Sequence, residues 1–87
     1  MNNIFVDTWA WYALADKTDI NHHIVAKETE KLLDDNYTFT TTNYVLYETL
    51  TLVRYKMNHA LTLKLWDLIL ELEKTNLLTI IRVSETQ

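Results

Sequence analysis

Glycine and proline are both absent from this chain of 87 residues. Average usage would supply about 6 glycines and about 4 prolines in a chain of this length. Every tight turn must therefore be made by asparagine, aspartate, serine or threonine. The absence also excludes the glycine-rich loops that bind dinucleotides or nucleoside triphosphates, because those loops need glycine at fixed positions.

The size and composition are those of one small globular domain spanning residues 1–87, with 48% hydrophobic and 23% charged residues. No cysteine is present, which excludes disulfides and thiolate metal sites and fits a cytoplasmic protein. Charged residues interrupt every apolar run, so neither a membrane span nor a signal peptide is expected. The net charge of −4 argues against a nucleic-acid coat protein, but not against a nuclease whose acids hold a divalent cation.

A short apolar run near the N-terminus ends abruptly in a carboxylate. Ile4 to Val6 is too short for a helix and suits a strand buried on both faces. Thr8 is a suitable cap for a helix from Trp9 to Asp16. Ligands of open parallel sheets bind beyond the carboxyl ends of the strands. We therefore expect Asp7 to be a catalytic group or a ligand of a hard cation, in preference to the alternative that it only caps this helix.

The remaining chain alternates between helical and strand patterns. Helices are expected over 20–33, 43–56 and 59–74, and strands over 37–41 and 77–83. The expected caps are Asp19 for the first of these helices, Thr42 or Asn43 for the second, and Asn58 for the third. Asn36 and Asn76 are expected in the turns that end two of the helices. The order βααβααβ predicts an α/β fold, a parallel sheet with helical crossovers in two or three layers.

Apolar spacing marks the buried sides of the two later helices. Leu61, Leu65, Leu68 and Leu72 form one stripe at helical spacing. In the preceding helix, Val45, Glu48 and Leu52 share a side, so a carboxylate interrupts an apolar face and should have a partner or a cation. The alternative is that Glu48 lies at the edge of the stripe, reaches water or pairs with Arg54.

Other polar and aromatic residues carry weaker signals. Thr40 to Asn43 end a strand and begin a helix, where a hydroxyl could cap the helix or orient Asp7. Adjacent histidines on a helix do not face the same way, so His22 and His23 are not expected to bind a metal. The tryptophans are expected in the core or in an interface rather than as stacking platforms for bases.

Two stretches together resemble the PIN-domain nucleases, especially the VapC-type toxins of bacterial toxin–antitoxin pairs. They are Ile4-Phe5-Val6-Asp7-Thr8-Trp9-Ala10-Trp11-Tyr12-Ala13-Leu14 and Thr41-Thr42-Asn43-Tyr44-Val45-Leu46-Tyr47-Glu48-Thr49-Leu50-Thr51-Leu52. The intervening Asp16, Asn21 and His22 extend the similarity through nearly the whole chain.

The resemblance implies a parallel sheet flanked by helices and the cleavage of RNA with Mg²⁺ or Mn²⁺. Asp7 matches the family's first metal-binding and catalytic acid, and Glu48 matches its second. Thr8 matches the supporting hydroxyl, and Thr42 is a further candidate for that role. A cognate antitoxin is the protein partner that the resemblance implies.

The chain departs from the family at its C-terminus. Family members continue through another helix, a third and a fourth acid and further strands, and Glu85 does not match the third acid. We therefore expect the N-terminal two-thirds of a PIN domain, with a sheet edge and apolar surface exposed and little nuclease activity. Such a chain is expected to form homo-oligomers or domain-swapped dimers.

Two other functions fit parts of the pattern. A non-catalytic remnant that binds an antitoxin or dimerises would use the same fold without the chemistry. Phosphoryl-transfer enzymes and receiver domains also place an aspartate at a strand end. The second aspartate of the phosphatase pattern is missing here, because Trp9 stands two positions after Asp7, and the acidic pair typical of receiver domains is absent too.

Overall fold

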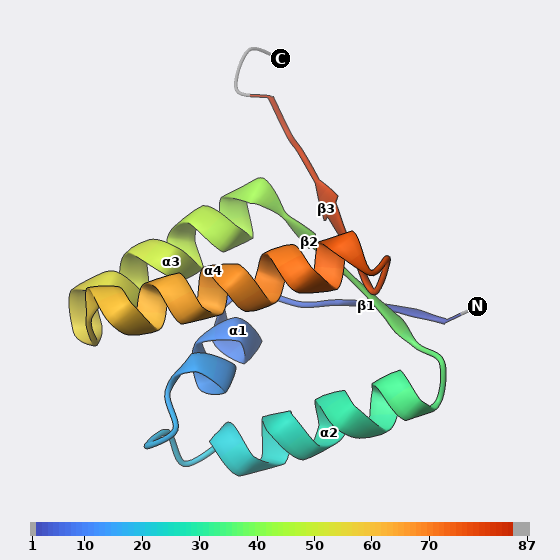
Figure 1. Ribbon diagram of the computed structural model, residues 1–87, viewed down its shortest axis with the longest axis horizontal. Helices are drawn as coiled ribbons and strands as arrows, with labels where there is room; N and C mark the ends of the chain where they lie inside the picture. The colour runs from blue at the N-terminus through green and yellow to red at the C-terminus, as the bar shows by residue number, and fades with distance from the viewer. Residues whose placement is uncertain (1, 85–87) are drawn as a thin grey trace.

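The computed structural model describes residues 2–84, and Glu85 lies outside them. These residues form three strands and four helices in the predicted order βααβααβ (Figure 1). The elements are β1 (Asn3–Phe5), α1 (Thr8–Ala15), α2 (His22–Asp34), β2 (Thr38–Thr42), α3 (Asn43–Lys56), α4 (His59–Lys74) and β3 (Leu78–Ile81). None of the four helices in this part of the chain is long and apolar enough to cross a membrane.

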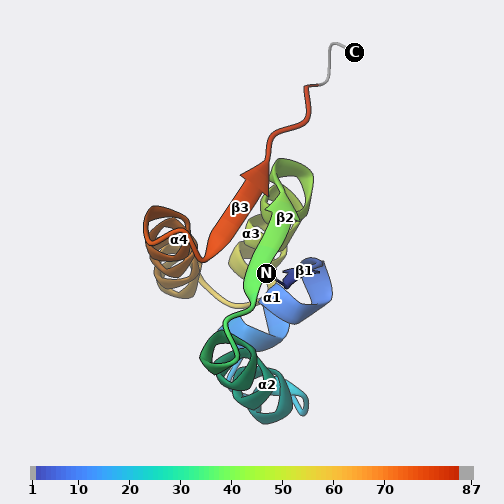
Figure 2. The same cartoon turned by 90° about the vertical axis from the view of Figure 1, so that its right-hand side faces the viewer.

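The strands form one parallel sheet in the order β1-β2-β3 (Figure 2). Ile4 pairs with Phe39, and Thr40 pairs with Thr79. β2 is the central strand, so β1 and β3 each present a free edge within the described chain. The predicted parallel sheet is confirmed, although β1 and β2 are displaced by one residue from the expected ranges and β3 is shorter than expected.

The helices cover only one face of the sheet. Burial alternates along β2 and β3: Phe39, Thr41, Leu78 and Ile80 are buried, whereas the intervening residues are half-buried in β2 and exposed in β3. The expectation that β1 is buried on both faces is wrong, since Phe5 is 54% exposed. The architecture is therefore two-layered.

Asparagine makes the two turns that most need backbone freedom. Asn36 follows α2 and Asn76 follows α4, each with a φ of 64°. In both turns the next amide bonds back to a helix carbonyl, Tyr37 N to Leu32 O and Leu77 N to Leu72 O, each at 2.9 Å. This is the Schellman ending that glycine usually provides, so the predicted asparagine turns are confirmed.

Side-chain caps begin three of the helices. Asn58 caps α4 and Thr42 caps α3, as predicted. The prediction that Thr8 caps α1 is wrong, because Asp7 accepts the capping bond and Thr8 is the first helical residue. The predicted start of α2 is also wrong. Asp19 accepts a 2.7 Å hydrogen bond from the Asn21 amide inside the preceding turn, and the helix begins only at His22.

α1 is the central helix of the helical layer. It packs against α2, α3 and α4 (Figure 1) and contributes the buried Trp11 to the core. Phe39, Val53, Leu65 and Ile69 join that core. In the predicted α4 stripe Leu65 is buried, but Leu68 is 42% exposed, so the stripe is only partly right.

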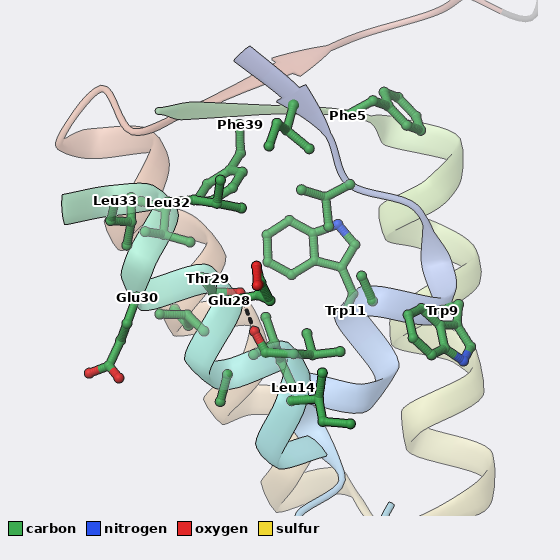
Figure 3. A pocket seen from close by; sticks show the side chains of 18 residues that line it. Phe5, Trp9, Trp11, Leu14, Glu28, Thr29, Glu30, Leu32, Leu33 and Phe39 are labelled. Atoms are coloured by element: carbon green, nitrogen blue, oxygen red, sulfur yellow. Dashed lines mark hydrogen bonds between the residues drawn. The ribbon is translucent and has the colours of Figure 1, made fainter. Parts of the chain in front are cut away.

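α2 lies apart from the α3 and α4 pair, with α1 between them (Figures 1 and 2). None of the α2 residues is buried. The space between α2, α1, β1 and α4 is an apolar groove of about 700 Å³, which Figure 3 shows from close by. The expectation of exposed apolar surface and a free sheet edge is therefore confirmed.

Candidate functional site

The carboxyl end of β1 is fixed by bonds to β2. The Val6 amide donates to the Thr40 carbonyl at 2.8 Å, so pairing continues one residue beyond β1. The Val6 carbonyl in turn accepts a 2.9 Å hydrogen bond from the hydroxyl of Thr41. These two bonds set the direction in which the chain leaves the sheet at Asp7.

Asp7 is exposed at the end of β1, at the edge of the sheet where ligands of parallel folds bind. Its backbone is extended, with φ −94° and ψ 178°. One carboxylate oxygen accepts the Ala10 amide at 3.2 Å and so caps α1. Its second oxygen has no hydrogen-bond partner within residues 2–84. Capping therefore leaves one oxygen of Asp7 open for a ligand.

Glu48 is held beside the start of α1. The hydroxyl of Thr8 donates a hydrogen bond of 2.6 Å to Oε1 of Glu48. This bond joins residues 40 positions apart and brings the α3 carboxylate next to the residue that follows Asp7.

The prediction that Glu48 interrupts a buried face is wrong. Leu46, Thr49 and Val53 form the buried side of α3, because α1, α4 and β2 pack there. Glu48 is exposed beside that side. The alternative position at the edge of the stripe is the observed one.

A buried polar link connects the strand ends to α1. Thr41 is fully buried, and its hydroxyl accepts a 3.4 Å hydrogen bond from the indole nitrogen of Trp11. The same hydroxyl donates to Val6. From the sequence, Thr41 could be recognised only as a threonine near the end of a strand, and its bonds to Trp11 and Val6 could not be predicted. Its place on the same side of β2 as Phe39 was the available sign of burial.

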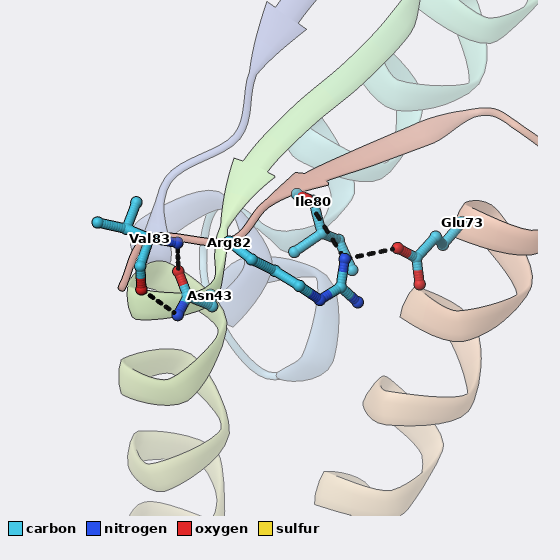
Figure 4. A network of polar contacts seen from close by, with 5 residues as sticks. All are labelled: Asn43, Glu73, Ile80, Arg82 and Val83. Atoms are coloured by element: carbon cyan, nitrogen blue, oxygen red, sulfur yellow. Dashed lines mark hydrogen bonds and ion pairs between the residues drawn. The ribbon is translucent and has the colours of Figure 1, made fainter. Parts of the chain in front are cut away.

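Thr42 and Asn43 hold the start of α3. The Thr42 hydroxyl accepts the Val45 amide at 3.1 Å and so serves as a cap, and within residues 2–84 no hydrogen bond joins it to Asp7. The Asn43 side chain makes two bonds to the backbone of Val83, one of 3.1 Å and one of 2.8 Å (Figure 4). Asn43 thereby fixes the residues after β3 against α3, a role that its sequence position did not reveal.

Figure 4 also shows the ion pair of this region, between Arg82 and Glu73 at 3.2 Å. The Arg82 side chain is 64% exposed. Such a pair contributes at most about 1 kcal/mol, because water screens it.

The described acids and histidines do not form a ready-made metal cluster. No group of three or more such side chains is positioned around a common point within residues 2–84. Asp7 and Glu48 are the donors that the fold brings to one region, and carboxylate oxygens suit Mg²⁺ or Mn²⁺. The donor chemistry of these two carboxylates fits a hard divalent cation.

His22 is not available for such a role through Nδ1. That nitrogen lies 2.7 Å from the Ala13 carbonyl oxygen, which makes it the donor. The bond joins the first residue of α2 to α1, in keeping with the expected position of His22 at a helix end.

Asp16 belongs to the turn after α1. The hydroxyl and then the amide of Thr18 donate to the same oxygen of Asp16, at 2.6 and 3.0 Å. These bonds favour the ionised form and lower the pKa of the Asp16 carboxyl from its ordinary value. One oxygen of this carboxylate is therefore engaged inside its turn.

Comparison with known proteins gives a likeness to solved structures. No protein-family model matches the chain, and no curated protein matches it. Among solved structures it resembles VapC20 of Mycobacterium tuberculosis, a toxin that cleaves the sarcin–ricin loop, with a TM-score of 0.72 and 25% identity. The match covers 95% of this chain and 58% of that toxin.

The likeness extends over nearly the whole chain. The resemblance seen in the sequence is therefore confirmed at the level of the fold. The described chain has a VapC-like PIN fold, over a length that corresponds to 58% of the matching toxin.

Proposed function

We propose that this chain carries the first half of a PIN-type ribonuclease site, with Asp7 and Glu48 as its acids. The observation that carries the proposal is the Thr8–Glu48 hydrogen bond of 2.6 Å. It holds the Glu48 carboxylate of α3 beside Thr8, the first residue of α1, which directly follows Asp7. In a VapC-like fold, these two acids support RNA as the substrate. We place its action in the cytoplasm, in keeping with the absence of cysteine.

The two carboxylates would hold Mg²⁺ or Mn²⁺, which supplies an activated water and neutralises charge on the phosphate during hydrolysis. Thr8 keeps Glu48 oriented, and the α1 backbone keeps Asp7 oriented through the Ala10 amide. Two acids hold such a cation less firmly than three or four. We therefore propose weak metal binding and slow cleavage for the chain as it stands.

Direct metal binding tests this site without depending on turnover. Mn²⁺ is titrated into the chain and the free ion is followed by electron paramagnetic resonance. Asp7→Asn and Glu48→Gln should each weaken binding at least tenfold. Glu30→Gln removes an exposed acid of α2 and should change nothing. Equal binding by all four proteins would overturn the assignment.

Cleavage of a sarcin–ricin-loop hairpin is the matching activity assay. That hairpin is the substrate of the similar toxin and serves here as the probe. Mg²⁺-dependent cleavage is expected to be slow in the wild type and lost in Asp7→Asn and Glu48→Gln. Cleavage by either variant at the wild-type rate would exclude that residue from the reaction.

The apolar groove favours a second function, the binding of an antitoxin helix. Its walls include Phe5 and Trp9, which Figure 3 labels. Leu68 of α4 also lines it. The charged residues lining it are the acids Glu28 and Glu30. A helix with an apolar face and basic flanks would be complementary to this groove.

A peptide from the protein encoded beside this gene tests that function. Binding should shift the emission of Trp9, which is 56% exposed, and should weaken in Leu68→Glu. Binding without cleavage at any metal concentration would make this second function the main one.

A further inference from the structure

Two polar side chains within residues 2–84 are fully buried, those of Thr41 in β2 and Thr49 in α3. The Thr49 hydroxyl donates a 2.7 Å hydrogen bond to the Val45 carbonyl one turn earlier in its own helix, as helical threonines commonly do. The Thr41 hydroxyl instead bonds to two segments that are distant from it in the sequence. Valine would fill the same space without placing a polar atom in the core. The hydroxyl of Thr41 therefore indicates a role beyond packing.

The first of its bonds fixes the peptide group that leads into Asp7. The Thr41 hydroxyl donates to the Val6 carbonyl at 2.9 Å. That carbonyl and the Asp7 amide belong to one planar peptide group, so a bond that holds the carbonyl also holds the backbone from which the Asp7 side chain departs. The hydroxyl thus acts on the peptide group directly before Asp7.

The second bond holds the chain on the other side of Asp7. The same hydroxyl accepts a 3.4 Å hydrogen bond from the indole nitrogen of Trp11, whose ring is buried in the core. The backbone amide of Trp11 donates to the Asp7 carbonyl at 3.3 Å. One buried hydroxyl therefore joins the residue before Asp7 to the helical turn after it.

We infer that Thr41 is the residue that positions the Asp7 carboxylate, and that the metal affinity of the Asp7 and Glu48 site depends on the Thr41 hydroxyl. This inference rests on the proposed function, because it takes Asp7 as a metal ligand. Asp7 is exposed, and within residues 2–84 one hydrogen bond restrains its carboxylate, from the Ala10 amide at 3.2 Å. Its backbone must therefore supply most of its orientation. A group that is already oriented loses less conformational entropy when a ligand binds.

Thr41→Val tests the physical link in the metal-free protein. The substitution keeps the shape of the side chain and removes the hydroxyl, so Asp7 should be held less firmly and its bond to the Ala10 amide should open more often. Hydrogen exchange followed by nuclear magnetic resonance should be at least about fivefold faster at the Ala10 amide than in the wild type. Thr41→Ser keeps the hydroxyl and should exchange as the wild type does.

Thr49→Val is the matched control. It also replaces a fully buried threonine and also removes a hydrogen bond to a backbone carbonyl, but that bond lies inside α3. Exchange at the Ala10 amide should stay at the wild-type rate. Urea denaturation measures the free energy of unfolding of both valine variants, so that a general loss of stability is separated from a local effect at Asp7.

The metal site itself is measured by titration with Mn²⁺, with the free ion followed by electron paramagnetic resonance. Thr41→Val should weaken binding by about threefold to tenfold, less than Asp7→Asn does, because it displaces a ligand without removing it. Thr41→Ser and Thr49→Val should bind Mn²⁺ as the wild type does. If Thr41→Val does not fold, Thr41→Cys takes its place. Its thiol is a weaker donor, so the same losses should appear at smaller size.

Any of four results would exclude the inference. They are unchanged exchange at the Ala10 amide in Thr41→Val, wild-type Mn²⁺ affinity in that variant while Asp7→Asn binds weakly, no recovery in Thr41→Ser, and an equal loss of affinity in Thr49→Val. Wild-type affinity in Asp7→Asn would instead contradict the proposed function. Exchange at the Ala10 amide would then decide by itself whether Thr41 positions Asp7.

Discussion

At two points in this fold, an asparagine adopts the backbone conformation that glycine usually provides. Asn36 and Asn76 both take the left-handed conformation directly after a helix. Asparagine tolerates that region better than other residues with a side chain, because its short amide bonds locally. The chain can therefore end α2 and α4 sharply without a glycine.

Substitutions at Asn76 should rank by their tolerance of positive φ. Asn76→Gly should leave the free energy of unfolding unchanged or raise it slightly. Asn76→Val should lower it by about 1–2 kcal/mol, because a branched Cβ clashes in the left-handed region. Urea denaturation followed by circular dichroism measures both. Equal stability of the glycine and valine variants would contradict the turn geometry.

The capping and turn roles of several residues could be predicted from the sequence immediately around them. Thr42, Asn58 and Asn76 act on backbone groups within three or four positions, so the sequence around them is sufficient. Thr8 and Asp7 are both good caps and adjacent, and local signals could not choose between them. The bond from Thr8 to Glu48 spans 40 positions, so only the folded chain reveals it.

At the scale of elements, the sheet is unusual in leaving one face uncovered, since parallel sheets are commonly covered on both faces. Side chains on the outer face make this possible. Thr38 and Thr40 bond to the side chain of Asn3 across the two strands, at 2.9 and 2.5 Å. Hydroxyl and amide groups thus make part of the open face polar, while Phe5 and Ile81 lie exposed on the same face.

α2 should open more readily than the other long helices. It has no buried residue, and α1 is its principal neighbour, so little apolar contact opposes local unfolding. Hydrogen exchange followed by mass spectrometry should show faster exchange in α2 than in α3 and α4. Equal protection of the three helices would show that α2 unfolds only with the whole domain.

The elements themselves were largely predictable, and the errors have identifiable causes. The predicted start of α2 was too early, because both Asp19 and Asn21 are residue types that cap helices. Asp19 bonds inside the preceding turn instead, and α2 begins after Asn21. The buried side of α3 was misjudged because Val45 and Leu52 suggested one face while packing by α1 and α4 selected Leu46 and Val53. Periodicity locates a helix, but its neighbours decide which side is buried.

At the scale of the whole molecule, stability depends on a core drawn from every layer. Trp11, Phe39, Val53 and Ile69 come from α1, β2, α3 and α4. The chain measures 38 × 36 × 19 Å along its principal axes, so this core is thin. The family resemblance predicted the fold as a whole, whereas the width of the apolar groove depends on how α2 packs.

Ile69 should be among the most sensitive core positions, since it is fully buried. Ile69→Ala should lower the free energy of unfolding by about 2–5 kcal/mol, a large share of the stability of a small domain. Ile24→Ala, at a position that is 61% exposed, should change it by less than about 0.5 kcal/mol. Thermal and urea unfolding would measure both changes. Similar losses of stability in the two variants would show that Ile69 is not part of the core.

The buried Trp11 gives this protein an internal optical probe. Trp9 and Trp66 are 56% and 37% exposed, whereas Trp11 is 1% exposed and bonds to Thr41 at the strand ends. Its fluorescence should therefore be blue-shifted and shielded from quenchers such as acrylamide. With Trp9 and Trp66 replaced by phenylalanine, the remaining emission would come from Trp11 alone, which lies between the carboxyl edge of the sheet and the apolar groove.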